Sequence, residues 1–145
     1  MARLTDKPAD LKQSTIEMRK GLARKIAARA QSLGENPTIV PGLALYRREQ
    51  PTPCFHATYE PSVSVFVQGK KHVSRGGTEY LCDGSSFLLS SIDVPAVGQI
   101  VEASKKVPLL SMFLRFDMPT VREVTSREDL PELPIPGWSR GCLAL

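Results

Sequence analysis

The chain has 145 residues, of which 41% are hydrophobic and 23% charged, a composition that fits one globular domain with its own core and excludes a disordered chain. No apolar run reaches the roughly 18 residues of a membrane helix, and the polar first residues lack the apolar segment of a secretory signal, so we expect a cytoplasmic protein without membrane contact. The net charge of +4 comes from residues 1–33, which carry +5, whereas residues 34–145 carry −1. This near-neutral charge argues against a phosphate-binding surface on residues 34–145.

Residues 1–35 are expected to form an N-terminal basic amphipathic helix, with its regular part within residues 9–33. Four apolar side chains recur there every four residues: Met18, Leu22, Ile26 and Ala30. Gly34 is typical of a helix C-terminus, and Pro37 would keep the helix from resuming. The basic face could meet nucleic acid or a membrane surface, but no aromatic residues interleave with it. We therefore expect a solvated face, with the apolar stripe packed on the rest of the domain.

Residues 36–117 predict a mainly β domain, because short apolar segments are separated there by Gly, Pro or Asp-Gly turns. In residues 62–68, valines alternate with Ser64, Phe66 and Gln68, which indicates a strand with two different faces. The expected strands cover residues 38–40, 43–48, 62–68, 71–75, 78–81, 85–91, 97–103 and 109–116, and residues 49–57 are expected to form a loop with two prolines. About eight or nine short strands favour a closed or nearly closed antiparallel barrel over an open sheet.

Residues 118–145 predict a short helix followed by a tail. Pro119 suits the first turn of a helix that continues to about Val124. Residues 130–141 contain three prolines and two glycines, which oppose both helix and sheet. The mildly apolar residues 142–145 resemble the start of a further region, so we expect an excised domain or a truncated protein.

The sequence offers few ligands for a metal ion. A barrel of this size often holds one, but the chain has only His56 and His72, which are not paired, and Glu79 could add one more ligand on a neighbouring strand. Stable transition-metal sites in proteins generally use three or four protein ligands. We therefore expect neither a metal nor another cofactor.

Nucleophilic catalysis is not indicated either. Cys54 and His56 are close in the chain, but no acidic residue in their proline-rich loop would complete a triad. The three cysteines are Cys54, Cys82 and Cys142, and their wide spacing and odd number predict unpaired thiols. We expect no catalytic residue and no enzyme activity.

An apolar barrel interior remains as the place for a ligand. Small barrels either fill with side chains or hold one small molecule. For each aromatic residue of the predicted strands, a role in the core is the simpler interpretation. These residues are nevertheless the candidates for effector binding: Tyr46, Phe66, Tyr80, Phe87 and Phe113.

Several segments resemble the N-terminal domain of AraC-type transcriptional regulators. The most specific are YEPSVSVFVQGKKHV at residues 59–73 and SSIDVPAVGQIVEAS at residues 90–104; PGLALYRREQPTP and LLSMFLRFD also fit, and the resemblance covers roughly residues 22–145. It implies a cupin-like barrel of the double-stranded β-helix type. In that family the domain senses a small effector or mediates dimerisation, and it controls a C-terminal helix-turn-helix region that binds DNA.

The chain departs from the family pattern because that C-terminal region is absent from the sequence. We therefore expect a regulatory domain that recognises a small-molecule effector, forms a homodimer, or both, and that does not itself bind nucleic acid. Two alternatives stay open: a metal-free or degenerate cupin that binds a small molecule, or a cupin-type enzyme. A nucleic-acid module using the basic helix is a third hypothesis, which we expect to fail.

Overall fold

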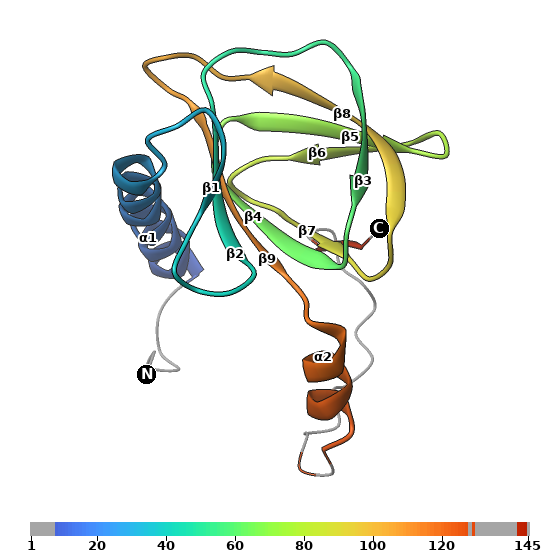
Figure 1. Cartoon of the computed structure of the whole chain (residues 1–145). Coiled ribbons are helices and arrows are strands. Elements are labelled where there is room, and N and C mark those ends of the chain that lie inside the picture. The colour runs from blue at the N-terminus through green and yellow to red at the C-terminus, as the bar shows by residue number, and fades with distance from the viewer. Residues whose placement is uncertain (1–7, 128, 130–141, 145) are drawn as a thin grey trace.

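The computed structural model of the protein describes residues 8–127, 129 and 142–144. A long helix, α1 (Pro8–Arg29), precedes nine strands, and a short helix follows them (Figure 1). The strands are β1 (Gly34–Pro37), β2 (Leu43–Arg48), β3 (Phe55–Tyr59), β4 (Ser62–Gln68), β5 (Lys70–Arg75), β6 (Thr78–Cys82), β7 (Phe87–Ser90), β8 (Val94–Glu102) and β9 (Leu109–Arg115). After helix α2 (Met118–Thr125), strand β10 (Cys142–Ala144) is the last described element.

The strands form two facing sheets. One has six strands in the order β1-β2-β9-β4-β7-β10, and the other has four in the order β3-β8-β5-β6. Neighbouring strands are antiparallel, except that β10 runs parallel to β7. The prediction of a mainly β, antiparallel fold with an N-terminal helix and a short C-terminal helix is confirmed. The expected closure needs correction, because the strands divide between two sheets in a jelly-roll-like sandwich rather than one closed barrel.

Helix α1 covers the outer face of the six-stranded sheet. Ala23 and Ile26 of the helix, and Ala30 directly after it, are buried against Leu45 of β2, Val67 of β4 and Leu110 of β9. Side chains alternate between the two faces of a strand, so β4 sends Val67 to the helix and Phe66 to the space between the sheets. The predicted stripe packs as expected over its second half, whereas Met18 near its start is 66% exposed.

The helix ends at Arg29, earlier than its predicted end at residue 33. The side chain of Asn36 explains the early end: its Oδ1 accepts from the Ser32 backbone N–H at 3.1 Å, and its Nδ2 donates to the Ser32 carbonyl at 2.8 Å. These bonds hold the bend at residues 32 and 33, directly before strand β1. Gly34, with φ of +89°, therefore begins strand β1 instead of capping the helix.

Two further boundaries differ from the prediction. Residues 38–40 form a turn instead of a strand, and Thr38 Oγ1 closes it by donating to the Leu43 carbonyl at 2.8 Å. The expected loop 49–57 contains the start of β3, which lies at the edge of the four-stranded sheet and pairs with β8. Edge strands tolerate preceding prolines because one side of the strand needs no ladder bonds.

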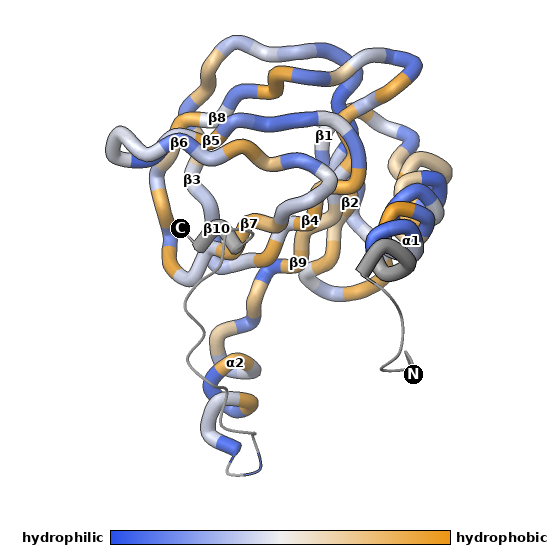
Figure 2. Tube along the Cα trace, turned by 180° about the vertical axis from the view of Figure 1, so that it is seen from behind, coloured by the Kyte–Doolittle hydropathy of each residue, from blue (hydrophilic) through white to orange (hydrophobic). Residues whose placement is uncertain are grey.

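Helix α2 extends away from the sandwich in both views (Figures 1 and 2), and Asp117 caps its start by accepting from the Thr120 N–H at 3.2 Å. The short helix predicted from Pro119 is therefore confirmed. The predicted proline-rich tail, residues 130–141, lies outside the described residues. Neither helix is both long enough and apolar enough, over its described residues, to span a bilayer.

Candidate ligand pocket

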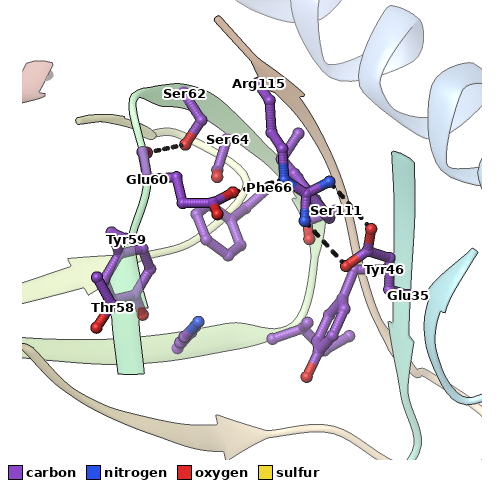
Figure 3. A pocket seen from close by; sticks show the side chains of 13 residues that line it. Glu35, Tyr46, Thr58, Tyr59, Glu60, Ser62, Ser64, Phe66, Ser111 and Arg115 are labelled. Carbon is purple, nitrogen blue, oxygen red and sulfur yellow. Dashed lines mark hydrogen bonds and ion pairs between the residues drawn. The ribbon is translucent and has the colours of Figure 1, made fainter. Parts of the chain in front are cut away.

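A pocket of about 190 Å³ opens between the two sheets (Figure 3). We call it the sandwich pocket. Its lining comes from β1 (Glu35), β2 (Tyr46), β3 and the turn after it (Thr58, Tyr59, Glu60), β4 (Ser62, Ser64, Phe66), β5 (Lys71) and β9 (Leu109, Ser111, Phe113, Arg115). On β4 and β9 the lining residues occupy alternate positions, which point to the same face of a strand.

Small side chains on the central strands leave the space. Phe66 of β4 lies opposite Ser111 of β9, and Ser64 lies opposite Phe113. Each large ring therefore has a serine beside it, where a filled sandwich would carry a second apolar side chain. The Ser62 hydroxyl donates to the Glu60 carbonyl at 2.8 Å. The hydroxyls of Ser64 and Ser111, in contrast, have no hydrogen-bond partner among the described residues and face the pocket.

Aromatic rings form much of the wall. Tyr46 is held in place by Arg48, whose Nε donates to the tyrosine hydroxyl at 2.9 Å and whose guanidinium lies 5.5 Å from the ring centroid. Phe66 belongs both to the wall and to the buried core between the sheets, which closes the pocket behind it. The other core residues are Val73, Cys82, Leu88, Val94 and Ala96. The pocket thus has a fixed apolar side.

An ion-pair cluster spans another part of the pocket (Figure 3). Arg115 donates from Nη1 and Nη2 to the two oxygens of Glu35 at 3.0 and 3.2 Å, and from Nε to Glu60 Oε2 at 2.8 Å. These hydrogen bonds raise the pKa of Arg115, which stays a cation in any case. The side chain is 41% exposed, so the cluster contributes little stability but orients three charged groups around the opening.

A second cation, Lys71, lies on the inner face of β5. Its Nζ is 5.0 Å from the ring centroid of Tyr59 and 5.6 Å from that of Phe55. Among the described residues no carboxylate lies within ion-pair distance of it. Burial lowers the pKa of Lys71, because the charged form loses hydration that no counter-ion replaces.

Tyr59, which also lines the pocket, carries an unpaired polar atom. Its hydroxyl oxygen is buried and has no hydrogen-bond partner within the described part of the chain. Burial also raises the pKa of this phenol far above its ordinary range, so Tyr59 is a neutral donor at any physiological pH.

The structure brings together three of the five aromatic candidates from the sequence, since Tyr46, Phe66 and Phe113 all line the sandwich pocket. Tyr80 packs against the core between the sheets and does not line the pocket. Phe87 lies on the outer face of β7, because the neighbouring Leu88 points inward, and it borders a shallow groove beside α1.

Sequence reasoning missed the polar residues of the pocket, above all Lys71 and Arg115. A signal for Lys71 was present: it lies two residues before Val73 on one strand, and such positions share a face. The same rule relates Arg115 to Phe113 on β9. The ion pairs of Arg115 had no such signal, since their partners are far away in the chain.

The residues considered for a metal do not gather. His72 Nδ1 lies 3.6 Å from Glu79 Oε2 on the outside of the β5–β6 hairpin, and both side chains are exposed. His56 is exposed on β3, and Cys54 is an exposed free thiol. Within residues 12–127 and 129, no group of three or more His, Cys, Asp or Glu side chains could hold a metal ion.

Comparison with known proteins gives one family match. The family model described as "AraC-type transcriptional regulator N-terminus" matches residues 39–142, which include every strand of the sandwich pocket except β1. No curated protein sequence matches the chain. A cupin-2 domain containing protein from Shewanella frigidimarina NCIMB 400 is a structural neighbour with a TM-score of 0.43 and 8% identity, covering 66% of this chain and 92% of its own.

Proposed function

We propose that this chain, which belongs to the family of AraC-type transcriptional regulator N-terminal domains, senses a small-molecule effector that binds in the sandwich pocket. Family membership supports a regulatory or sensing role in general. The assignment of that role to the sandwich pocket depends on the chemistry of its lining.

The observation that carries the proposal is the combination of a fixed apolar wall with polar groups that lack partners. Ligand sites in proteins are concave, mainly apolar, and contain a few polar groups that set orientation. Here Tyr46, Phe66 and Phe113 supply the apolar area, while Lys71 and Tyr59 supply donors that no described protein group accepts. A pocket of about 190 Å³ is small for a ligand site, so the effector is expected to be a small metabolite.

The role is proposed to be binding without catalysis. Neither cysteine whose side chain is described suits a nucleophile: Cys54 lies outside the sandwich pocket, and burial raises the pKa of Cys82 to about 11. Dimerisation and an effector site are compatible, because the sandwich pocket lies between the sheets of one chain. Control of DNA binding would require a helix-turn-helix region acting with this domain.

Amide NMR spectra of the chain, recorded with a library of small acids, sugars, amines and alcohols, test the proposal. We expect at least one class to shift amides of β4, β5 and β9 around the sandwich pocket. Ser111→Leu, which fills the pocket, should abolish those shifts, whereas Met112→Leu on the opposite face of β9 should preserve them. Shifts that survive Ser111→Leu, or a library without effect on these strands, would overturn the proposal.

A further inference from the structure

Two adjacent lysines of β5 differ in their surroundings. Lys70 points outward, and its Nζ pairs with Glu102 Oε2 at 2.7 Å on the protein surface. Lys71 points between the sheets, where its neighbours in register are Ile100 of β8 and Cys82 of β6, both buried. An inward strand position of this kind normally carries an apolar residue. Lys71 instead places an ammonium group in the sandwich pocket without a counter-ion from the described residues.

A second donor lies beside this ammonium group. The Nζ of Lys71 lies 5.0 Å from the centre of the Tyr59 ring, and the hydroxyl of the same tyrosine is buried without a partner. Both groups donate hydrogen bonds and both have lost hydration. A negatively charged acceptor entering the pocket would serve both of them, and charge-assisted hydrogen bonds are the stronger kind.

The acceptors already in the pocket are engaged or neutral. Arg115 holds the carboxylates of Glu35 and Glu60, and the serine hydroxyls carry no charge. Two cations and two carboxylates therefore line the pocket, so its formal charge is zero. A ligand with one negative charge can pair with Lys71, whereas a phosphate dianion would bring net negative charge close to Glu35 and Glu60.

The rest of the pocket suits a flat apolar body. Phe66 and Phe113 lie diagonally across β4 and β9, and Tyr46 borders Ser111 on the other side. The serines beside these rings leave part of the space between the aromatic side chains open. Aromatic walls favour rings or short planar chains that can stack or pack edge to face.

We propose that the sandwich pocket selects a small monocarboxylic acid with a planar apolar body, bound as the carboxylate by Lys71 and Tyr59. This inference rests on the proposed function, since it names the class of effector for the same pocket. The carboxylate accepts hydrogen bonds from Lys71 Nζ and the Tyr59 hydroxyl, and the apolar body packs between the rings of β4 and β9.

Binding of benzoate to the whole chain, measured by calorimetry and amide NMR, tests the inference, with benzamide and benzylamine as neutral and cationic analogues. Benzoate should bind at least about tenfold more tightly than either analogue, because only it can pair with Lys71. Lys71→Met should weaken benzoate binding by about tenfold or more, and Tyr59→Phe by severalfold. Lys70→Met is the matched control and should change the affinity little.

The outcomes separate the inference from the proposed function. Equal affinity for benzoate and benzamide, or full benzoate binding by Lys71→Met, would overturn the choice of a carboxylate while the pocket stays the ligand site. If no compound shifts the amides of β4, β5 and β9, both the inference and the proposed function fail. Thermal unfolding controls for folding, and Lys71→Met should unfold no earlier than the wild type because it removes an unpaired, partly dehydrated charge.

Discussion

Replacing Ile26 by alanine should weaken the docking of α1 on the six-stranded sheet and so destabilise the domain. Ile26 is 2% exposed and is the largest fully buried side chain of α1 in the cluster with Leu45, Val67 and Leu110. The substitution removes three carbon groups, which at about 0.8 kcal/mol each amount to about 2.4 kcal/mol of lost transfer free energy. The cavity left behind adds to this loss, so the free energy of unfolding should fall by about 3 kcal/mol.

Urea unfolding followed by far-UV circular dichroism measures this change. Met18→Ala is the matched control on the same helix, since Met18 is 66% exposed and alanine is at least as good a helix former as methionine. It should change the free energy of unfolding by no more than about 0.5 kcal/mol. If Ile26→Ala costs less than about 1 kcal/mol, or no more than Met18→Ala, then α1 does not dock through this side chain and the explanation of the fold is wrong.

Three further predictions concern the sandwich itself. The raised pKa of Cys82, from 9.0 to about 11, means that the folded state holds the thiol proton longer than the unfolded state. The free energy of unfolding should therefore fall between pH 9 and 11, by at most about 1.4 kcal/mol per pH unit. Cys82→Ala should flatten this fall when urea titrations are repeated across that pH range. An unchanged slope would show that Cys82 is not the group responsible. Gly69 has φ of +81°, and an added Cβ would lie 2.7 Å from Leu109 Cα. Gly69→Ala should therefore lower the melting temperature far more than Gly76→Ala, whose Cβ meets no atom within 4 Å. Equal losses in melting temperature would contradict this explanation. Arg115→Met should change the free energy of unfolding by no more than about 1 kcal/mol, because its ion pairs are exposed, and a larger loss in the same titration would show that the cluster is structural.

The central strands could be predicted because each pairs on both sides and is bounded by strong turns. Ser62–Gln68 is a strand over the expected residues, and the turn at Gly76-Gly77 joins β5 to β6 as its two glycines indicate. The edge strands β1 and β3 were missed. The sequence of β1, GENP, has no apolar alternation, and its formation depends on its one neighbour, β2, rather than on local propensity. The sequence of β3, FHATY, does alternate between apolar and polar residues, but the two prolines before it favoured the interpretation as a loop.

The pocket could be predicted only in part. Aromatic residues on predicted strands were natural candidates, and three of them line it. Which face of each strand turns inward depends on where α1 docks, and the sequence does not give that contact. Once α1 covers the side of Val67 and Leu110, the alternation places Phe66 and Ser111 on the pocket side. The pocket composition is therefore a consequence of the packing of the helix.

The energetics of the pocket favour a ligand over a purely structural role. A buried hydroxyl without a partner, such as that of Tyr59, costs about 1–3 kcal/mol, and a partly dehydrated ammonium without a counter-ion adds to that cost. Phenylalanine at position 59 and methionine at position 71 would remove both penalties while keeping the size of the side chains. The ring contacts of Lys71 offset part of its cost, but they leave the Tyr59 hydroxyl unpaired. The proposed carboxylate between the two residues would convert both penalties into charge-assisted hydrogen bonds.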